Sequence, residues 1–120
     1  MNKVHVARFD HRALLVSVNQ TVEELSIYDA ARYAWRLSLD RANQVEVVLA
    51  VEKGVIIGAF VPEKWMEATT ANFPGQSELT GRLGFVGSEA SSDIQDRYLG
   101  RGVPEEFRFG SGNPIRYTWK

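Results

Sequence analysis

Short apolar runs separated by polar gaps predict strands along much of the chain. The first run, ALLVSV at 13–18, is rich in β-branched residues and turns polar at Asn19. Two further runs, VEVVLAV at 45–51 and VIIGAFV at 55–61, are separated only by a short turn that contains Gly54. β-Branched runs around such a turn predict a hairpin. Their nearly continuous hydrophobicity predicts strands that are covered on both faces.

Later segments extend the predicted sheet. Pro62 is expected to end the second hairpin arm, because proline lacks the N–H that a central strand needs. KWMEA at 64–68 is then expected to form a single turn that carries Trp65. RLGFVG at 82–87 predicts a fourth strand, and IRYTW at 115–119 alternates as a final strand would. TTANFPGQSELTG at 69–81 is polar and predicts an exposed loop, of a length that is either mobile or functional.

A first helix is predicted to begin at Ser26, although Thr21 with Glu24 forms a second capping pattern. Ser26 with Asp29 places a hydroxyl and a carboxylate where free amides of a first turn need them. From there, apolar residues recur at steps of three and four and define one stripe: Ile27, Tyr28, Ala31, Trp35 and Leu39. The spacing predicts that Trp35 is buried on this helix.

Two shorter helical segments complete the expected fold. Ser38 marks either a kink or the start of a second short helix. Another helix is predicted from Glu89 to Tyr98, begun by Ser88 and ended by Gly100. The whole pattern predicts an α+β fold, with a small, curled, mainly antiparallel sheet of about five strands and two or three helices packed on it.

Composition and charge narrow the classes of protein. With 120 residues and 44% hydrophobic content, the chain is expected to form one domain over residues 1–120. Its formal net charge of −1 creates no strong overall field, so any nucleic-acid site must be a local basic patch. The chain lacks cysteine, an apolar leader and any run near the roughly 18 apolar residues of a membrane span. A cytoplasmic protein without membrane contact is expected.

No motif for catalysis or metal binding is recognisable. His5 and His11 are the only histidines, and their spacing fits neither a zincin nor a zinc finger. The carboxylates show no spacing that identifies an acid–base pair. GRLGFVG at 81–87 is not the dinucleotide fingerprint, and no serine lies in a nucleophile elbow. We therefore expect no catalytic residue, no metal and no cofactor.

Arginine or lysine stands next to an aromatic residue at several places. Aromatic rings can stack on bases while cations hold phosphates, so several such pairs on one surface would suit nucleic acid. The alternative is that the aromatics belong to the core and the cations are solvated, because adjacent residues usually face different ways. For Arg32 and Arg36 in particular, Asp29 and Asp40 are potential ion-pair partners on the helix. The predicted nucleic-acid contacts are Arg32, Arg36, Lys64, Trp65, Arg82, Arg101 and Arg116.

Several segments together carry a resemblance to a known family: YDAARYAWRL (28–37), RANQVEVVLAVEKGVIIGAF (41–60), the turn at Trp65, RLGFVG (82–87), RYLGRGVP (97–104) and NPIRY (113–117). Their order resembles a bacterial family of small uncharacterised domains that also occur after GIY-YIG-type nuclease domains. A GIY-YIG nuclease needs paired tyrosine motifs, a catalytic arginine and a glutamate, and these are not recognisable here. The resemblance therefore implies an accessory role in nucleic-acid recognition and no nuclease activity. The curled sheet also looks like PUA-type barrels, an analogy of fold alone.

Three functional hypotheses follow, and the oligomeric state stays open. The leading one is a non-catalytic accessory domain that binds nucleic acid. The alternative is a protein-interaction or regulatory module, phage- or defence-associated, that uses the loop at 69–81 and exposed aromatic residues against a protein partner. The third is an enzyme whose site is assembled from dispersed polar residues, for which a deep pocket with converging polar groups would be the sign.

Overall fold

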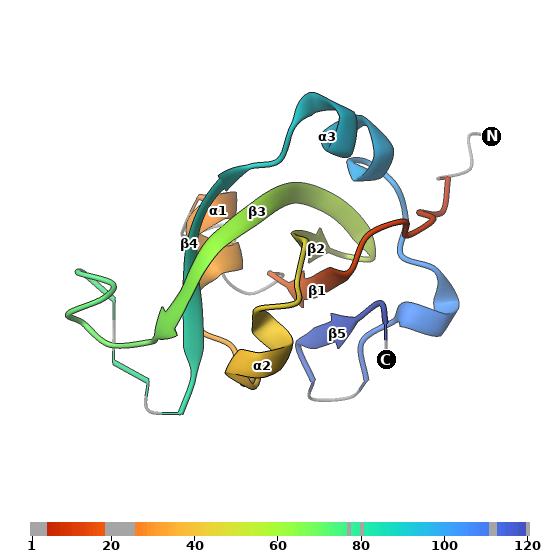
Figure 1. Ribbon diagram of the computed structural model, residues 1–120. Helices are drawn as coiled ribbons and strands as arrows, with labels where there is room; N and C mark the ends of the chain where they lie inside the picture. Colours follow the sequence, from red (N-terminus) through yellow and green to blue (C-terminus); the bar gives the residue numbers. More distant parts are fainter. Residues whose placement is uncertain (1–4, 19–25, 77, 80, 111–112, 120) are drawn as a thin grey trace.

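Five strands form one mixed sheet in the order β4-β3-β2-β1-β5 (Figure 1). The computed structural model describes residues 5–18, 26–76, 78–79, 81–110 and 113–119. Parallel pairing joins β1 to β2, and the other neighbours are antiparallel. The predicted α+β fold with a mainly antiparallel sheet is confirmed, but the sheet is not closed into a barrel, because β4 and β5 lie at its two edges. The strands are β1 (Ala13–Ser17), β2 (Val47–Glu52), β3 (Val55–Glu67), β4 (Leu83–Glu89) and β5 (Ile115–Tyr117).

The hairpin of β2 and β3 is confirmed and lies in the middle of the sheet. Lys53 and Gly54 form its turn with φ angles of 51° and 78°, the left-handed region that two-residue hairpin turns require. Along β2, side chains alternate between two core clusters on opposite faces: Val48 and Ala50 join one cluster, and Val47, Leu49 and Val51 join the other. The central strands are therefore covered on both faces, as their hydrophobicity predicts.

β3 continues past Pro62 to Glu67, so the predicted strand end at Pro62 and the predicted turn at Trp65 are wrong. The register between β3 and β4 shifts between Pro62 and Lys64, and such an irregularity is where a strand tolerates proline. The residue opposite Pro62 is Gly87, where a Cβ atom would lie 2.1 Å from the carbonyl oxygen of Val61. Proline and glycine together allow β3 to bend here without ending.

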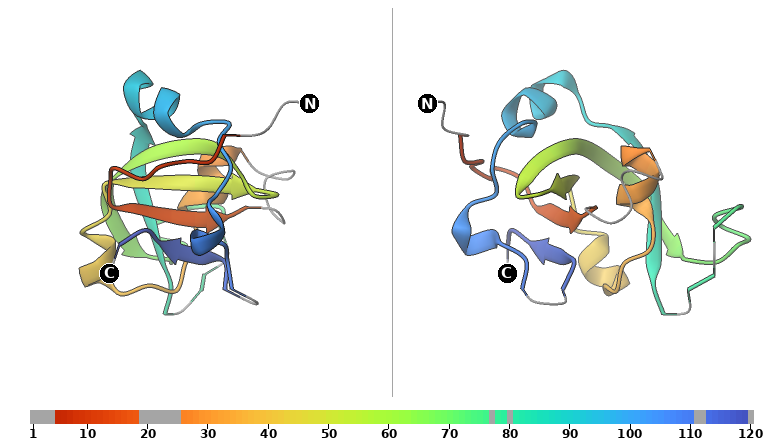
Figure 2. Two further views of the ribbon diagram at one scale, coloured as in Figure 1. Left: turned by 90° about the vertical axis from the view of Figure 1, so that its right-hand side faces the viewer. Right: turned by 180° about the vertical axis from the view of Figure 1, so that it is seen from behind.

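Three helices flank the sheet (Figure 2): α1 (Ile27–Arg32), α2 (Leu39–Ala42) and α3 (Ser92–Tyr98). The side chains of Ser26 and Ser38 accept hydrogen bonds from the third residue beyond them, so both predicted helix starts are confirmed. The alternative start at Thr21 lies outside the described residues. α3 begins after Ser91 instead of Ser88, because β4 continues to Glu89.

Trp35 is buried, with 8% of its surface exposed, but it does not lie on a helix. α1 ends at Arg32, and Trp35 forms an antiparallel bridge to Leu83 with two backbone hydrogen bonds of 2.8 and 2.9 Å. Its indole N–H donates to the carbonyl oxygen of Ala31, one of the free carbonyls at the end of α1. The predicted stripe is therefore wrong beyond Ala31, and Leu39 is 50% exposed.

The sheet separates the two core clusters. α1 contributes Ala30 and Ala31 to the cluster that contains Trp35, Trp65 and Phe85. α3 contributes Tyr98 to the other cluster. None of the helices in the described ranges has the length and hydropathy needed to cross a membrane.

Candidate functional site

Strand alternation brings three of the predicted cations onto one face of the molecule. Trp65 lies opposite Phe85 and Trp35 lies opposite Leu83, and all four side chains belong to or pack on one core cluster. Because successive residues of an extended chain point to opposite faces, the neighbours of these core residues point away from that cluster. Those neighbours are Lys64, Arg36 and Arg82.

Arg36 and Arg82 lie on the same side of one isolated bridge. Arg36 directly follows Trp35 and Arg82 directly precedes Leu83, the two residues that this antiparallel bridge joins. Lys64 lies opposite Val86, which is four residues along β4 from Arg82 and therefore on the same face. The separation between Arg82 and Val86 is about 13 Å along the strand.

Arg32 joins this face through Phe73, which is fully buried. A Cβ atom on Gly84 would lie 2.6 Å from the Phe73 ring and 2.7 Å from the carbonyl oxygen of Arg32, so both press on the backbone of β4. The Arg32 guanidinium stands 5.2 Å from the Phe73 ring centre and also forms a 3.3 Å ion pair with Asp29. We name Arg32, Arg36, Lys64 and Arg82 the cationic face.

The cationic face is only partly neutralised by acidic groups. Within the described ranges, Arg36, Lys64 and Arg82 have no carboxylate at ion-pair distance. Arg36 and Lys64 are exposed, and Arg82 is half-buried. Glu78 lies close enough to act on Tyr33, whose ring packs edge-on against Phe73. Burial is the larger cause that raises the pKa of Tyr33, and the negative charge of Glu78 is the smaller one. The acidic neighbours of the cationic face are therefore Asp29, which is paired with Arg32, and Glu78.

The other three predicted contacts lie elsewhere. Trp65 is 7% exposed, so its indole lies in the core where it cannot stack on a base. The carbonyl oxygen of Arg101 accepts a hydrogen bond from Ile56, near the turn of the central hairpin. Arg116 lies on the edge strand β5 and donates to the carbonyl oxygen of Glu106 at 2.9 Å. Strand alternation therefore places Arg36, Lys64 and Arg82 on one face, with Arg32 beside it.

Sequence reasoning missed Arg41, which stacks between aromatic residues of the C-terminal segment. Its guanidinium lies 4.0 Å from the ring centre of Tyr117 and 5.0 Å from that of Trp119, and it donates to the Trp119 carbonyl oxygen at 3.1 Å. Among the described residues, the Nε atoms of Arg41 and Trp119 (Nε1) and the Tyr117 hydroxyl are buried without hydrogen-bond partners. No local pattern could find this cluster, because Arg41 comes from α2.

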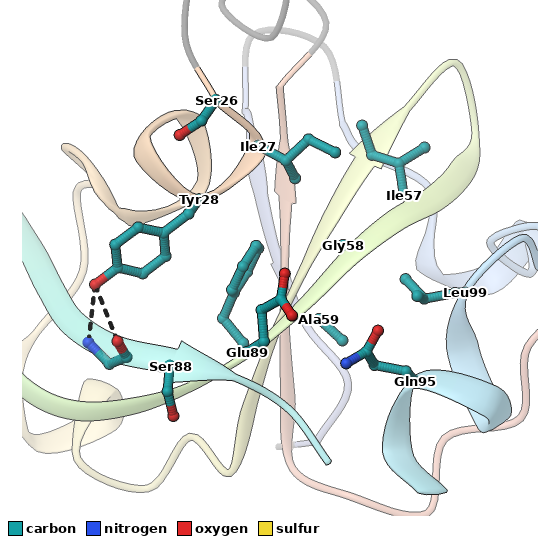
Figure 3. Close-up of a pocket in the computed structure, with 12 residues that line it drawn as sticks. Ser26, Ile27, Tyr28, Ile57, Gly58, Ala59, Ser88, Glu89, Gln95 and Leu99 are labelled. Carbon is teal, nitrogen blue, oxygen red and sulfur yellow. Dashed lines mark hydrogen bonds between the residues drawn. The ribbon is translucent and has the colours of Figure 1, made fainter. Parts of the chain in front are cut away.

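A pocket of about 550 Å³ opens between α1 and α3, over the middle of β3 and the end of β4 (Figure 3). Next to it, the Tyr28 hydroxyl accepts a hydrogen bond from the Gly87 N–H at 3.0 Å and donates to the Gly87 carbonyl oxygen at 3.2 Å. The twelve described residues that line the pocket include one carboxylate, Glu89, and no histidine, lysine or arginine. The pocket therefore suits binding better than acid–base chemistry.

The two histidines do not form a metal centre with other described residues. His11 Nδ1 lies 2.7 Å from the Tyr98 hydroxyl, and His5 is exposed. In the described part of the chain, no three or more histidine or carboxylate side chains lie together in a way that could hold a metal ion.

The loop at 69–81 presents little apolar surface to a partner. Its aromatic residue, Phe73, is buried against β4, and Leu79 is the large apolar side chain exposed on it within the described ranges. Residues 77 and 80 lie outside those ranges. The protein-interaction hypothesis gains no specific support from this loop and stays a prediction.

Comparisons with known proteins give no relative: no protein-family model, curated protein or solved structure matches the chain. The resemblance to domains that follow GIY-YIG nucleases therefore stays a prediction. Function has to be argued from the geometry of the cationic face and the pocket.

Proposed function

We propose that this domain binds nucleic acid and does not catalyse a reaction. Its cationic face contacts the phosphate backbone of the nucleic acid. The observation that carries the proposal is the position of Arg36 and Arg82 next to the bridge between Trp35 and Leu83, without carboxylate partners among the described residues. Like charges on one face repel each other, and a polyanion relieves that repulsion while it gains counterion release. Lys64 lies on the same face, and Arg32 lies beside it with its charge paired to Asp29.

The dimensions of the cationic face suit a short stretch of one strand. About 13 Å of chain separates Arg82 from the residue opposite Lys64, with Phe73 packed against Gly84 between them. Roughly four stacked nucleotides at about 3.4 Å each span that length. Phe73 is buried and Tyr33 half-buried, so bases would stack on guanidinium planes more than on rings. The proposal therefore describes binding that is electrostatic and tolerant of sequence, in keeping with an accessory role beside another activity.

Fluorescence anisotropy with short single-stranded DNA and RNA, and with duplexes of the same length, tests the proposal across a salt series. We expect micromolar binding at low salt that weakens as salt rises. Three to four phosphate contacts at about 0.7 each give a slope of log K against log salt of roughly −2 to −3 for single strands. Binding that is absent, or that does not respond to salt, contradicts the proposal.

Two double variants distinguish binding at the cationic face from an effect of the net charge of the protein. Arg36→Ala with Arg82→Ala removes two cations from the face, and Arg101→Ala with Arg116→Ala removes two from elsewhere. The first pair is expected to make the salt slope shallower by about 1.4, and the second pair is expected to leave it nearly unchanged. Equal losses in both pairs would mean that only net charge matters. Circular dichroism checks that both variants remain folded.

A further inference from the structure

We propose that the pocket between α1, β3, β4 and α3 binds a small organic amine with an apolar body. This inference is independent of nucleic-acid binding at the cationic face. The pocket volume of about 550 Å³ lies within the range of roughly 300 to 1,000 Å³ that is usual for small-molecule sites.

The walls of the pocket supply apolar surface for the body of the ligand. Ile27 of α1, Ile57 of β3 and Leu99 after α3 line it and are all half-buried, so a ligand can remove further apolar area from water. Phe60 and Tyr28 add aromatic surface, with ring centres 5.3 Å apart. These groups favour an aliphatic or aromatic body.

The form of this surface depends on Gly58. A Cβ atom there would lie 2.6 Å from the Ile27 side chain, so glycine lets α1 approach β3. The apolar wall is therefore set by close packing between the helix and the strand, which favours a pocket that exists before a ligand arrives.

The polar groups of the pocket favour a hydrogen-bond donor with positive charge. Glu89 is the one charged residue among the described lining residues, and Figure 3 shows its carboxylate between α1 and α3. The Gln95 side chain points into the same space, and its Nε2 atom already donates to the Ala90 carbonyl oxygen at 2.7 Å. Its side-chain oxygen is then left to accept a hydrogen bond, as Glu89 can. Two acceptors beside aromatic surface suit an ammonium group.

The outer edge of β4 argues against an extended peptide as the occupant. Leu83 exchanges two backbone hydrogen bonds with Trp35 at that edge, and alternate residues of a strand point their backbone groups the same way. Gly87 therefore presents its backbone groups to the same edge, where Tyr28 binds both of them. Because Trp35 and Tyr28 occupy the edge, a peptide cannot add to β4 as a strand, and a small molecule fits better.

Nitrogen-15 NMR titrations with three probes that share a phenylethyl body test the inference: phenethylamine, 2-phenylethanol and 3-phenylpropanoate. We expect shifts at Gly58, Glu89 and Gln95, and phenethylamine binding about fivefold tighter than the alcohol, with the carboxylate weakest. A lysine-containing tetrapeptide serves as a fourth probe. No shifts at the pocket, carboxylate binding equal to that of the amine, or tighter binding of the peptide would overturn the inference.

Glu89→Gln identifies the group that selects the charge. The variant should bind phenethylamine and 2-phenylethanol about equally, because the amide keeps the shape of the carboxylate and loses its charge. Glu63→Gln, an exposed carboxylate of β3 outside the pocket lining, is the matched control and should keep the preference for the amine. A preference that survives Glu89→Gln contradicts the assignment of Glu89.

Discussion

The Tyr28 side chain replaces hydrogen bonds that the backbone of an edge strand would otherwise lack. Its hydroxyl binds both the N–H and the carbonyl oxygen of Gly87 at the outer edge of β4, where no further strand follows. Unpaired backbone groups at a half-buried position cost free energy, so this one hydroxyl stabilises the edge strand.

Tyr28→Phe is therefore expected to lower the free energy of unfolding by about 1 to 3 kcal/mol, because it leaves both backbone groups of Gly87 without this partner. Tyr117→Phe is the matched control. The Tyr117 hydroxyl is buried without a partner among the described residues, so its removal should be neutral or stabilising. Urea denaturation of both variants measures the difference. A greater loss for Tyr117→Phe would contradict this account of the two hydroxyls.

Alkaline pH should destabilise the fold through Tyr98. Burial is the largest cause that raises the pKa of this fully buried tyrosine above its ordinary value near 10. The folded state then holds the phenolic proton more tightly than the unfolded state does. The resulting stability is present below about pH 10 and is lost as the pH rises above it.

Tyr98→Phe should flatten this alkaline decline, because the variant has no phenol to ionise at that position. Melting temperatures of the two proteins, followed by circular dichroism from neutral to strongly alkaline pH, measure it. Burial also raises the pKa of Tyr33 and Tyr117, so a smaller decline should remain in the variant. Identical declines in both proteins would show that Tyr98 does not contribute.

Helices and strands whose bounds depend on neighbouring residues could be predicted from the sequence. Those whose bounds depend on contacts between distant segments could not. The central hairpin follows from β-branched runs around a glycine turn, and Ser26 and Ser38 cap helices through residues three positions away. The continuation of β3 through Pro62 depends on Gly87 of another strand. The end of α1 depends on pairing between Trp35 and Leu83. Both contacts join segments that are far apart in the sequence, so no local sequence pattern predicts them.

Gly87→Ala should be strongly destabilising, by about 3 kcal/mol, because the added Cβ would meet the Val61 carbonyl oxygen in a strand pair that cannot widen without breaking its ladder. Gly110→Ala is the control, since a Cβ there would meet nothing within 4 Å, and its effect should stay within about 0.5 kcal/mol. Thermal unfolding and resistance to proteolysis compare the two, and the second readout serves even if the first variant folds poorly. A well-folded Gly87→Ala protein would contradict the explanation of the bend at Pro62.

The residues of the candidate site could be predicted only in part, because strand geometry decides which neighbouring side chains share a face. Adjacent cation and aromatic residues suggested joint contacts, but alternation in β3 points Lys64 outward and buries Trp65. Arg36 and Arg82 were both expected, but their shared position next to the bridge between Trp35 and Leu83 depends on pairing between distant segments. The pocket beside Glu89 could not be predicted, because four separate elements line it.

At the scale of the whole molecule, a formal charge of −1 means that any affinity for nucleic acid must come from how the cations are distributed. Strand alternation places Arg36, Lys64 and Arg82 on one face, while Arg101 and Arg116 lie near the hairpin turn and on the opposite edge strand. The position at which an anionic chain binds therefore tests the proposed site more directly than its affinity does.

A nitrogen-15 NMR titration with a short single-stranded oligonucleotide measures that location most directly. The account predicts shifts at the backbone amides of Arg36, Lys64 and Arg82 that fade as salt is added, with Gly58 and Gln95 of the pocket unchanged. Shifts confined to Arg101 and Arg116, shifts spread evenly over the surface, or no shifts at low salt would contradict it.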